Sequence, residues 1–171
     1  MIIMLEIKIV NNNIDEVAKN SILKMFQNID DDIDYVSIRE VANMDTLIKL
    51  LQNENLIHYI SYDNDRPIGF AQIIYKSQSI NFNTGAKINS ISVLPTERHK
   101  GVGKTLLTYI IDDLKKRNGI YNLYLDVVQD NVNAIKLYSK LGFIKVGQLD
   151  NIFTKNNLIH NIEVYSLKIN S

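Results

Sequence analysis

The chain begins with an alternation of apolar and polar side chains over residues 5–10, which predicts a strand with one buried face. Apolar residues then recur at helical spacing as far as Phe26, behind an N-cap candidate, Asn13. A shorter stretch, residues 44–52, repeats the helical spacing. Between these two predicted helices, residues 30–34 (Asp-Asp-Asp-Ile-Asp) indicate an acidic, solvated loop.

A hairpin and a series of alternating strands and helices fill the rest of the chain. Residues 57–76 hold two β-rich runs around the turn Asp-Asn-Asp-Arg-Pro, and Pro67 can begin the second strand. Gly119 and Gly142 each follow a helical pattern, as a residue at a helix C-terminus should. Because strands alternate with helices, at least one strand pair should be parallel. The sequence therefore predicts a mixed α/β sandwich, formed as one domain over residues 1–171. Further strands are expected at residues 86–94, 122–128, 143–149 and 160–169, and further helices at 104–119 and 131–142.

The composition argues against several classes of function. Nineteen basic residues balance nineteen acidic ones, whereas a dedicated nucleic-acid binder normally carries a basic surplus. The absence of cysteine excludes disulfides, thiolate nucleophiles and cysteine zinc sites. None of the three histidines (His58, His99 and His160) has the spacing of a metal-ligand motif. No apolar run approaches the ~18 residues of a membrane span.

The N-terminal segment, residues 1–13, is too short for a secretory signal and carries an acidic residue, Glu6. We therefore expect a cytoplasmic enzyme or binding protein that uses no metal. Neither nucleic acid nor a membrane is an expected partner.

A glycine-containing turn at residues 98–103 (Arg-His-Lys-Gly-Val-Gly) has the composition of a phosphate-binding loop. The P-loop pattern GxxxxGK[ST] fails because its first glycine would fall on Arg98. The dinucleotide pattern GxGxxG fails because its third glycine would fall on Leu106. Gly101 and Gly103 still let the backbone approach an anion, and the N–H groups of the following helix can bind a pyrophosphate. A glycine-rich turn without a ligand is the alternative.

A second pattern lies at residues 130–143. Alone, it is more typical of a short amphipathic helix that ends at Gly142 with its apolar residues partly in the core. Its members at fixed offsets are Asn131, Ala134, Leu137, Tyr138, Gly142 and Phe143.

Together, in this order and spacing, the two patterns resemble the GNAT superfamily of N-acetyltransferases. The family's first motif, V-x-P followed by R-x-x-G-x-G, is matched by Val93, Pro95, Arg98, Gly101 and Gly103. The second motif, N…A…LY…GF, is matched by the six residues just named. The resemblance implies the GNAT fold, a mixed and mostly antiparallel sheet with a central, splayed parallel strand pair and helices on both faces.

The resemblance also implies how acetyl-CoA would be held. The backbone of residues 91–93 would pair with the pantetheine arm like an added strand, and amides of residues 99–104 would hold the pyrophosphate. An amide near Val93 would polarise the thioester oxygen, and Tyr138 would protonate the departing CoA sulfur. The absence of cysteine agrees with direct transfer. The expected acetyl-CoA-binding residues are Ile91, Ser92, Val93, Arg98, His99, Lys100, Gly101, Val102, Gly103, Lys104, Thr105, Asn131, Ala134 and Tyr138.

The general base is the least evident of the catalytic groups. Many family members carry a carboxylate on the strand before the glycine turn, but residues 87–93 contain none. Asp126 is the candidate that remains, because aspartate is disfavoured within a strand and some relatives place an active-site carboxylate at this position. The alternative is an Asp126 that faces solvent or pairs with a lysine, in which case ordered water would accept the proton.

The acceptor is predicted to be a primary amine. Residues 142–167 resemble the ending of bacterial members that acetylate amino acids or other small amines, so a small amine, an amino acid or a polyamine-like molecule, is the first expectation. The acidic residues 30–34 would attract a polyamine, although such loops are usually only solvated. A peptide N-terminus is the second and an aminoglycoside the third. A catalytically weak domain that binds or senses acyl-CoA is the alternative class, and a protein-interaction module is a weaker one. A homodimer would be consistent with the family.

Overall fold

The computed structural model describes residues 5–11, 13–27, 43–75, 85–155 and 157–170. The predicted acidic loop at residues 30–34 lies outside these ranges. In chain order, the elements are β1 (Glu6–Val10), α1 (Glu16–Gln27), α2 (Met44–Leu51), β2 (Leu56–Asp63), β3 (Arg66–Ile74), β4 (Gly85–Val93), the short 3-10 helix η1 (Pro95–Glu97), α3 (Val102–Lys115), β5 (Asn122–Val128), α4 (Val132–Lys140), β6 (Ile144–Lys155) and β7 (Leu158–Lys168).

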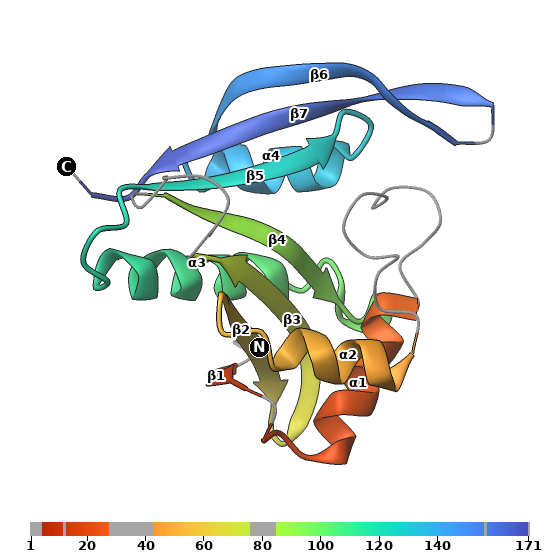
Figure 1. Ribbon diagram of the computed structural model, residues 1–171, viewed down its shortest axis with the longest axis vertical. Coiled ribbons are helices and arrows are strands. Elements are labelled where there is room, and N and C mark those ends of the chain that lie inside the picture. The colour runs from red at the N-terminus through yellow and green to blue at the C-terminus, as the bar shows by residue number, and fades with distance from the viewer. Residues whose placement is uncertain (1–4, 12, 28–42, 76–84, 156, 171) are drawn as a thin grey trace.

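A seven-stranded sheet in the order β1-β2-β3-β4-β5-β7-β6 runs through the molecule (Figure 1). Neighbouring strands are antiparallel except β4 and β5, which are parallel. The β4–β5 register joins residues 85–88 to residues 122–125 and then ends, although β4 continues to Val93 and β5 to Val128. Figure 1 shows the two strands separating toward their C-terminal ends. The predicted mixed sheet with a splayed parallel pair is confirmed.

Helices pack on both faces of the sheet, as predicted, and each face has its own hydrophobic core (Figure 1). On one face, Ile22 of α1 and Leu47 of α2 pack with Ile60 and Phe70 of the sheet. On the other face, α3 and α4 pack on Tyr59 and its neighbours. Tyr59 and Ile60 enter different cores because successive residues of a strand point to opposite faces. Each fully buried side chain of this kind stabilises the fold by roughly 1.5–3 kcal/mol.

The first helix begins behind a different cap from the predicted one. The Asp15 carboxylate accepts a hydrogen bond from the Ala18 N–H at 2.7 Å, the contact made by an N-cap residue. Asp15 is therefore the cap of α1, and the prediction of Asn13 was wrong. At α2, Asn43 and Thr46 form a capping box, in which each side chain bonds the other residue's backbone N–H.

The C-terminal signals were read correctly at one helix and wrongly at the other. Gly142 follows α4 with a φ of 91°, the left-handed conformation of the residue after a helix. Helix α3 instead ends at Lys115, so Gly119 lies in the following turn and does not close the helix. The last two strands differ from the prediction at the ends that face each other in the chain. Strand β6 continues beyond residue 149 to Lys155, and β7 begins at Leu158, before residue 160.

A partly buried hydrogen bond joins α3, the helix that follows the glycine turn, to the sheet. The Tyr59 hydroxyl donates to the Asp113 carboxylate at 2.7 Å, and Arg117 donates to the same carboxylate at 2.9 Å. Burial raises the pKa of Tyr59, so its hydroxyl stays protonated and remains a donor. The direction of α3 is therefore set by a polar contact as well as by the core.

Candidate active site

The separation of β4 from β5 leaves one backbone edge of β4 without a strand partner. Ile91, Ser92 and Val93 pair with β3 along their other edge. In the described part of the chain, no register pair joins these three residues to β5. An extended ligand that carries amide groups can bind such an edge like an added strand.

A β-bulge interrupts β4 directly before this edge. Gln72 of β3 pairs with Ser90, whereas the next residue, Ile73, pairs with Ile88, so Asn89 is an extra residue in β4. A bulge takes the extra residue out of the ladder and changes the direction of nearby side chains. The bulge lies a few residues before the predicted thioester contact near Val93.

The glycine turn lies between η1 and α3, beyond the C-terminal end of β4. Gly101 caps α3 with a φ of 87° and no side-chain hydrogen bond. His99 is also left-handed, with a φ of 63°. The backbone ladder of α3 begins with the bond from the Thr105 N–H to the Gly101 carbonyl, at 3.0 Å. The N–H groups before it have no carbonyl within the helix, so they and the helix dipole can bind an anion.

The side chains of the turn point partly inward and partly outward. Val102 is 1% exposed and packs into the interior. Arg98 donates from Nε to the Val93 carbonyl at 3.3 Å, which joins the turn to the end of β4. The predicted ligand-binding side chains at the surface are His99, Lys100, Lys104 and Thr105. The turn therefore has a buried support and an exposed, cationic outer surface.

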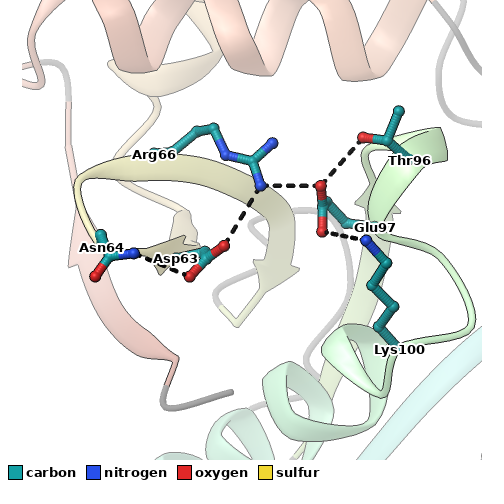
Figure 2. Close-up of polar contacts among 6 residues, drawn as sticks. All are labelled: Asp63, Asn64, Arg66, Thr96, Glu97 and Lys100. Carbon is teal, nitrogen blue, oxygen red and sulfur yellow. Dashed lines mark hydrogen bonds and ion pairs between the residues drawn. The ribbon is translucent and has the colours of Figure 1, made fainter. Parts of the chain in front are cut away.

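Two charged residues beside the turn, Glu97 and Arg66, were not predicted as part of the site from the sequence. Figure 2 shows the Glu97 carboxylate between Arg66 and Lys100. Hydrogen bonds from Arg66 and then Lys100 hold the pKa of Glu97 below its ordinary value, so the carboxylate is ionised at neutral pH. The one sequence signal for Glu97 was its place directly before Arg98, and Arg66 had none.

The second motif forms α4, as predicted. Asn131 is the N-cap of this helix, and its side-chain oxygen accepts a hydrogen bond from the Ala134 N–H at 3.1 Å. If Asn131 also binds acetyl-CoA, as predicted, its side chain has to serve both the helix cap and the ligand. Tyr138 is 6% exposed and meets the Phe143 ring edge-on, with ring centroids 5.8 Å apart. Tyr138 therefore lies in the core that α3 and α4 form with the sheet.

Asp126, the candidate base, forms an ion pair with Lys87. The pair crosses from β5 to β4 near the end of their register, where Lys87 stands opposite Tyr124. The side chain of Asp126 is 31% exposed and that of Lys87 is 42% exposed. This is the lysine-paired arrangement stated as the alternative for Asp126, and its catalytic role stays a prediction.

A row of buried polar side chains crosses β2, β3 and β4 and was not foreseen as a group. His58 stands opposite Gln72, and Gln72 stands opposite Ser90, so the three side chains are neighbours across the sheet. Each is at most 5% exposed. Both ring nitrogens of His58, Nε2 of Gln72 and Oγ of Ser90 have no hydrogen-bond partner among the described residues. The signal in the sequence was a single polar residue inside each apolar run, Leu-Ile-His-Tyr-Ile and Ala-Gln-Ile-Ile.

Burial of His58 predicts a loss of stability in acid. Burial, the largest influence on His58, lowers its pKa to about 4. The unfolded chain, with a histidine pKa near 6.5, binds a proton that the folded chain does not. Stability is therefore unaffected above pH ~6.5 and falls between pH ~6.5 and ~4, by ~3 kcal/mol at the acid end.

Urea unfolding at several pH values measures this loss. His58→Phe keeps a ring in contact with Phe70, which stacks on His58 with centroids 5.9 Å apart, but removes the titrating group. The difference in unfolding free energy between wild type and variant should change with pH only below ~6.5. A difference independent of pH would show that His58 titrates alike in both states.

In the described residues, no group of three or more acidic or histidine side chains could hold a metal ion. His160 pairs through Nδ1 with Asp130 at 2.7 Å, and His99 lies exposed in the glycine turn. No helix in the part of the chain that the structure describes is long and apolar enough to cross a membrane.

Comparison with known sequences agrees with the geometry. A sequence model of the Acetyltransferase (GNAT) family matches residues 23–143. The [Ribosomal protein bS18]-alanine N-acetyltransferase of Escherichia coli (strain K12) is 43% identical over 58 residues, which are 34% of this chain and 38% of that protein. The streptothricin acetyltransferase of Streptomyces lavendulae is 34% identical over 79 residues, 46% of this chain and 39% of that protein. The chain therefore matches about two fifths of the length of these relatives.

Solved structures show the same fold over nearly the whole chain. The crystal structure of the Escherichia coli ribosomal-protein-S18-alanine N-acetyltransferase has a TM-score of 0.76 at 22% identity, covering 98% of this chain and 96% of that one. A putative acetyltransferase from Salmonella typhimurium, solved with its cofactor acetyl-CoA, has a TM-score of 0.83 at 17% identity, covering 98% and 95%. The sequence motifs and the splayed β4–β5 pair agree with the family match over residues 23–143. This chain therefore belongs to the GNAT acetyltransferase family.

Proposed function

We propose that the protein transfers the acetyl group of acetyl-CoA to the α-amine of a peptide or protein N-terminus. The observation that carries the proposal is the unpaired edge of β4 at Ile91, Ser92 and Val93, which leads directly to the glycine turn. An edge strand that recognises amides and a turn that recognises a pyrophosphate, placed end to end, match the two chemical parts of coenzyme A.

Each step of acetyl transfer can be assigned to a group in this site. The amine nitrogen attacks the acetyl carbonyl carbon, and backbone N–H groups between the bulge and Val93 stabilise the negative charge on its oxygen. The carbon–sulfur bond then breaks, and Tyr138 donates its phenolic proton to the leaving sulfur. The proton lost by the amine passes either to Asp126 or to ordered water. Asp126 would need to loosen its ion pair with Lys87 to take this role.

The choice of a peptide amine over a small amine rests on the relatives. The Escherichia coli protein, whose name gives an alanine of a ribosomal protein as its acceptor, is similar in sequence over 58 residues and in fold over nearly the whole chain. The argument for a polyamine depended on residues 30–34, which lie outside the described part of the chain. A small amine is the second candidate acceptor, supported by the match to streptothricin acetyltransferase.

Thermal unfolding in the presence of candidate ligands tests the binding of acetyl-CoA. At a hundred times its dissociation constant, acetyl-CoA should raise the midpoint of thermal unfolding by roughly 5–10 °C. CoA should raise the midpoint similarly, whereas NAD and ATP should not change it. Release of CoA thiol, followed with peptides that begin with alanine, serine or methionine, then tests transfer. Free amino acids, spermidine and streptothricin serve as competing acceptors. We expect acetylation at the peptide α-amine, located by mass spectrometry.

The other outcomes of this experiment separate the alternatives. Turnover with small amines alone would make the peptide acceptor wrong and leave the transferase correct. Binding of CoA without turnover would favour an acyl-CoA-binding domain, a class that the engagement of Asp126 by Lys87 supports. No shift with acetyl-CoA or CoA would contradict the proposed function as a whole.

A further inference from the structure

Glu97 is a buried carboxylate directly before the glycine turn. It ends η1, and its side chain is 9% exposed. The residues that follow it are those expected to bind a pyrophosphate. A fixed negative charge at this place repels such a ligand. Its presence therefore needs a physical explanation.

Both oxygens of this carboxylate are engaged (Figure 2). Oε1 accepts hydrogen bonds from Arg66 Nη2 at 2.9 Å and from Thr96 Oγ1 at 3.2 Å. Oε2 accepts one from Lys100 Nζ at 3.1 Å. Arg66 is the first residue of β3, and it also contacts Asp63, the last residue of β2, at 3.4 Å. Glu97 thus joins the glycine turn to a hairpin 31 residues away in sequence.

The turn that Glu97 joins contains a strained residue. His99 has a φ of 63°, a conformation that a residue other than glycine keeps only where its surroundings fix the backbone. Gly101, the N-cap of α3, has no side chain with which to hold the turn. Among the contacts described for this turn, the side-chain bonds to the rest of the fold are those of Glu97 and the one from Arg98 to the Val93 carbonyl.

We propose that Glu97 is a positioning residue for the acetyl-CoA loop. By joining Arg66 to Lys100, it holds residues 98–103 in the shape that binds the pyrophosphate, in spite of its own repulsion of that ligand. Preorganisation of a binding loop raises affinity because the ordering cost is met before the ligand arrives. Glu97 acts through the loop and contacts no reacting atom. The inference rests on the proposed function.

Glu97→Gln separates positioning from charge, because the two effects have opposite signs. The substitution keeps the size of the side chain but removes a negative charge beside the loop, so electrostatics alone would tighten CoA binding. Loss of positioning would weaken it. We expect the dissociation constant for CoA and the KM for acetyl-CoA to rise about tenfold, with kcat at saturating acetyl-CoA within about twofold of wild type.

Asp112→Asn is the matched control. It removes the same charge from an exposed carboxylate of α3 that pairs with Lys115 at 3.5 Å, and it should leave CoA binding unchanged. Arg66→Gln should weaken binding as Glu97→Gln does, and the double variant should be no weaker than either single one, because both break the same contact. Unchanged or tighter CoA binding by Glu97→Gln would overturn the proposal.

Hydrogen exchange in the absence of CoA gives a second, independent reading. In Glu97→Gln, backbone amides of residues 98–103 should exchange faster than in wild type, while those of β2 and β3 should not change. Equal exchange in the two proteins would also overturn the proposal. If wild type bound no CoA, the proposed function would fail, and the exchange rates alone would then decide whether Glu97 orders the turn.

Discussion

Tyr138→Phe should lower kcat by about 10²–10⁴-fold while leaving the affinity for acetyl-CoA nearly unchanged. The substitution removes one oxygen from a side chain that is 6% exposed and keeps its edge-on contact with Phe143. The core should therefore survive. What is lost is the proton donor for the leaving sulfur, since a thiolate must otherwise depart without neutralisation. The measurement is kcat from CoA release at saturating acetyl-CoA, together with calorimetric binding of CoA.

Tyr165→Phe supplies a control of the same chemistry. Tyr165 is also 6% exposed and lies in the same core, but its hydroxyl donates to Glu163 of its own strand at 2.8 Å. This variant should keep kcat within about twofold of wild type, and any effect on stability should be similar to that of Tyr138→Phe. If the two variants retain equal activity, Tyr138 is not the acid.

The parts of the fold that were predictable from sequence depend on residues close together in the chain. Helix α4 was recognised because its apolar residues recur at helical spacing and end at Gly142. The glycine turn was recognised because Gly101 and Gly103 lie within one short stretch of the chain. The first cap was misread because three consecutive asparagines precede Asp15, and any of these side chains can cap a helix. Local signals define the presence of a helix better than its first residue.

The parts that were missed depend on contacts distant in sequence. The bulge at Asn89 exists only because Gln72 and Ile73 pair with residues on either side of it. The ion pair of Glu97 with Arg66 requires the start of β3 to lie beside η1, a position set by the pairing of β3 with β4. No pattern within a single segment contains this information. The polar row through His58 was likewise visible only as isolated residues until the register joined them.

Asp126 shows both what a local pattern reveals and what only a contact distant in sequence reveals. Its place in the middle of a strand made it noticeable, and the same reasoning allowed a lysine partner. That Lys87 is this partner follows from the parallel register of β4 and β5, which brings the two side chains together. A parallel pair cannot be aligned from sequence as a hairpin can, because no turn fixes its register.

Gly103→Val should abolish detectable binding of acetyl-CoA and CoA, a loss of at least about 100-fold in affinity. A Cβ at this position would point between Val93 of β4 and Leu137 of α4, at 3.9 and 3.6 Å from their nearest atoms. These are ordinary van der Waals distances, so the first carbon fits. The two further methyl groups of valine would extend from this position between β4 and α4, next to the turn that we propose binds the pyrophosphate.

Loss of binding through blocked approach must be told apart from loss of folding. Gly103 does not have a left-handed backbone, and valine costs an α-helix less than ~1 kcal/mol relative to its best residues, so the variant should unfold within a few degrees of wild type. Gly147→Val in β6 is the matched control, because its Cβ would meet only Val164, at 3.9 Å. It should bind CoA as wild type does. A folded Gly103→Val protein that still bound CoA would contradict the assignment of this turn to the pyrophosphate, since a backbone donor screened by two methyl groups cannot reach a phosphate oxygen.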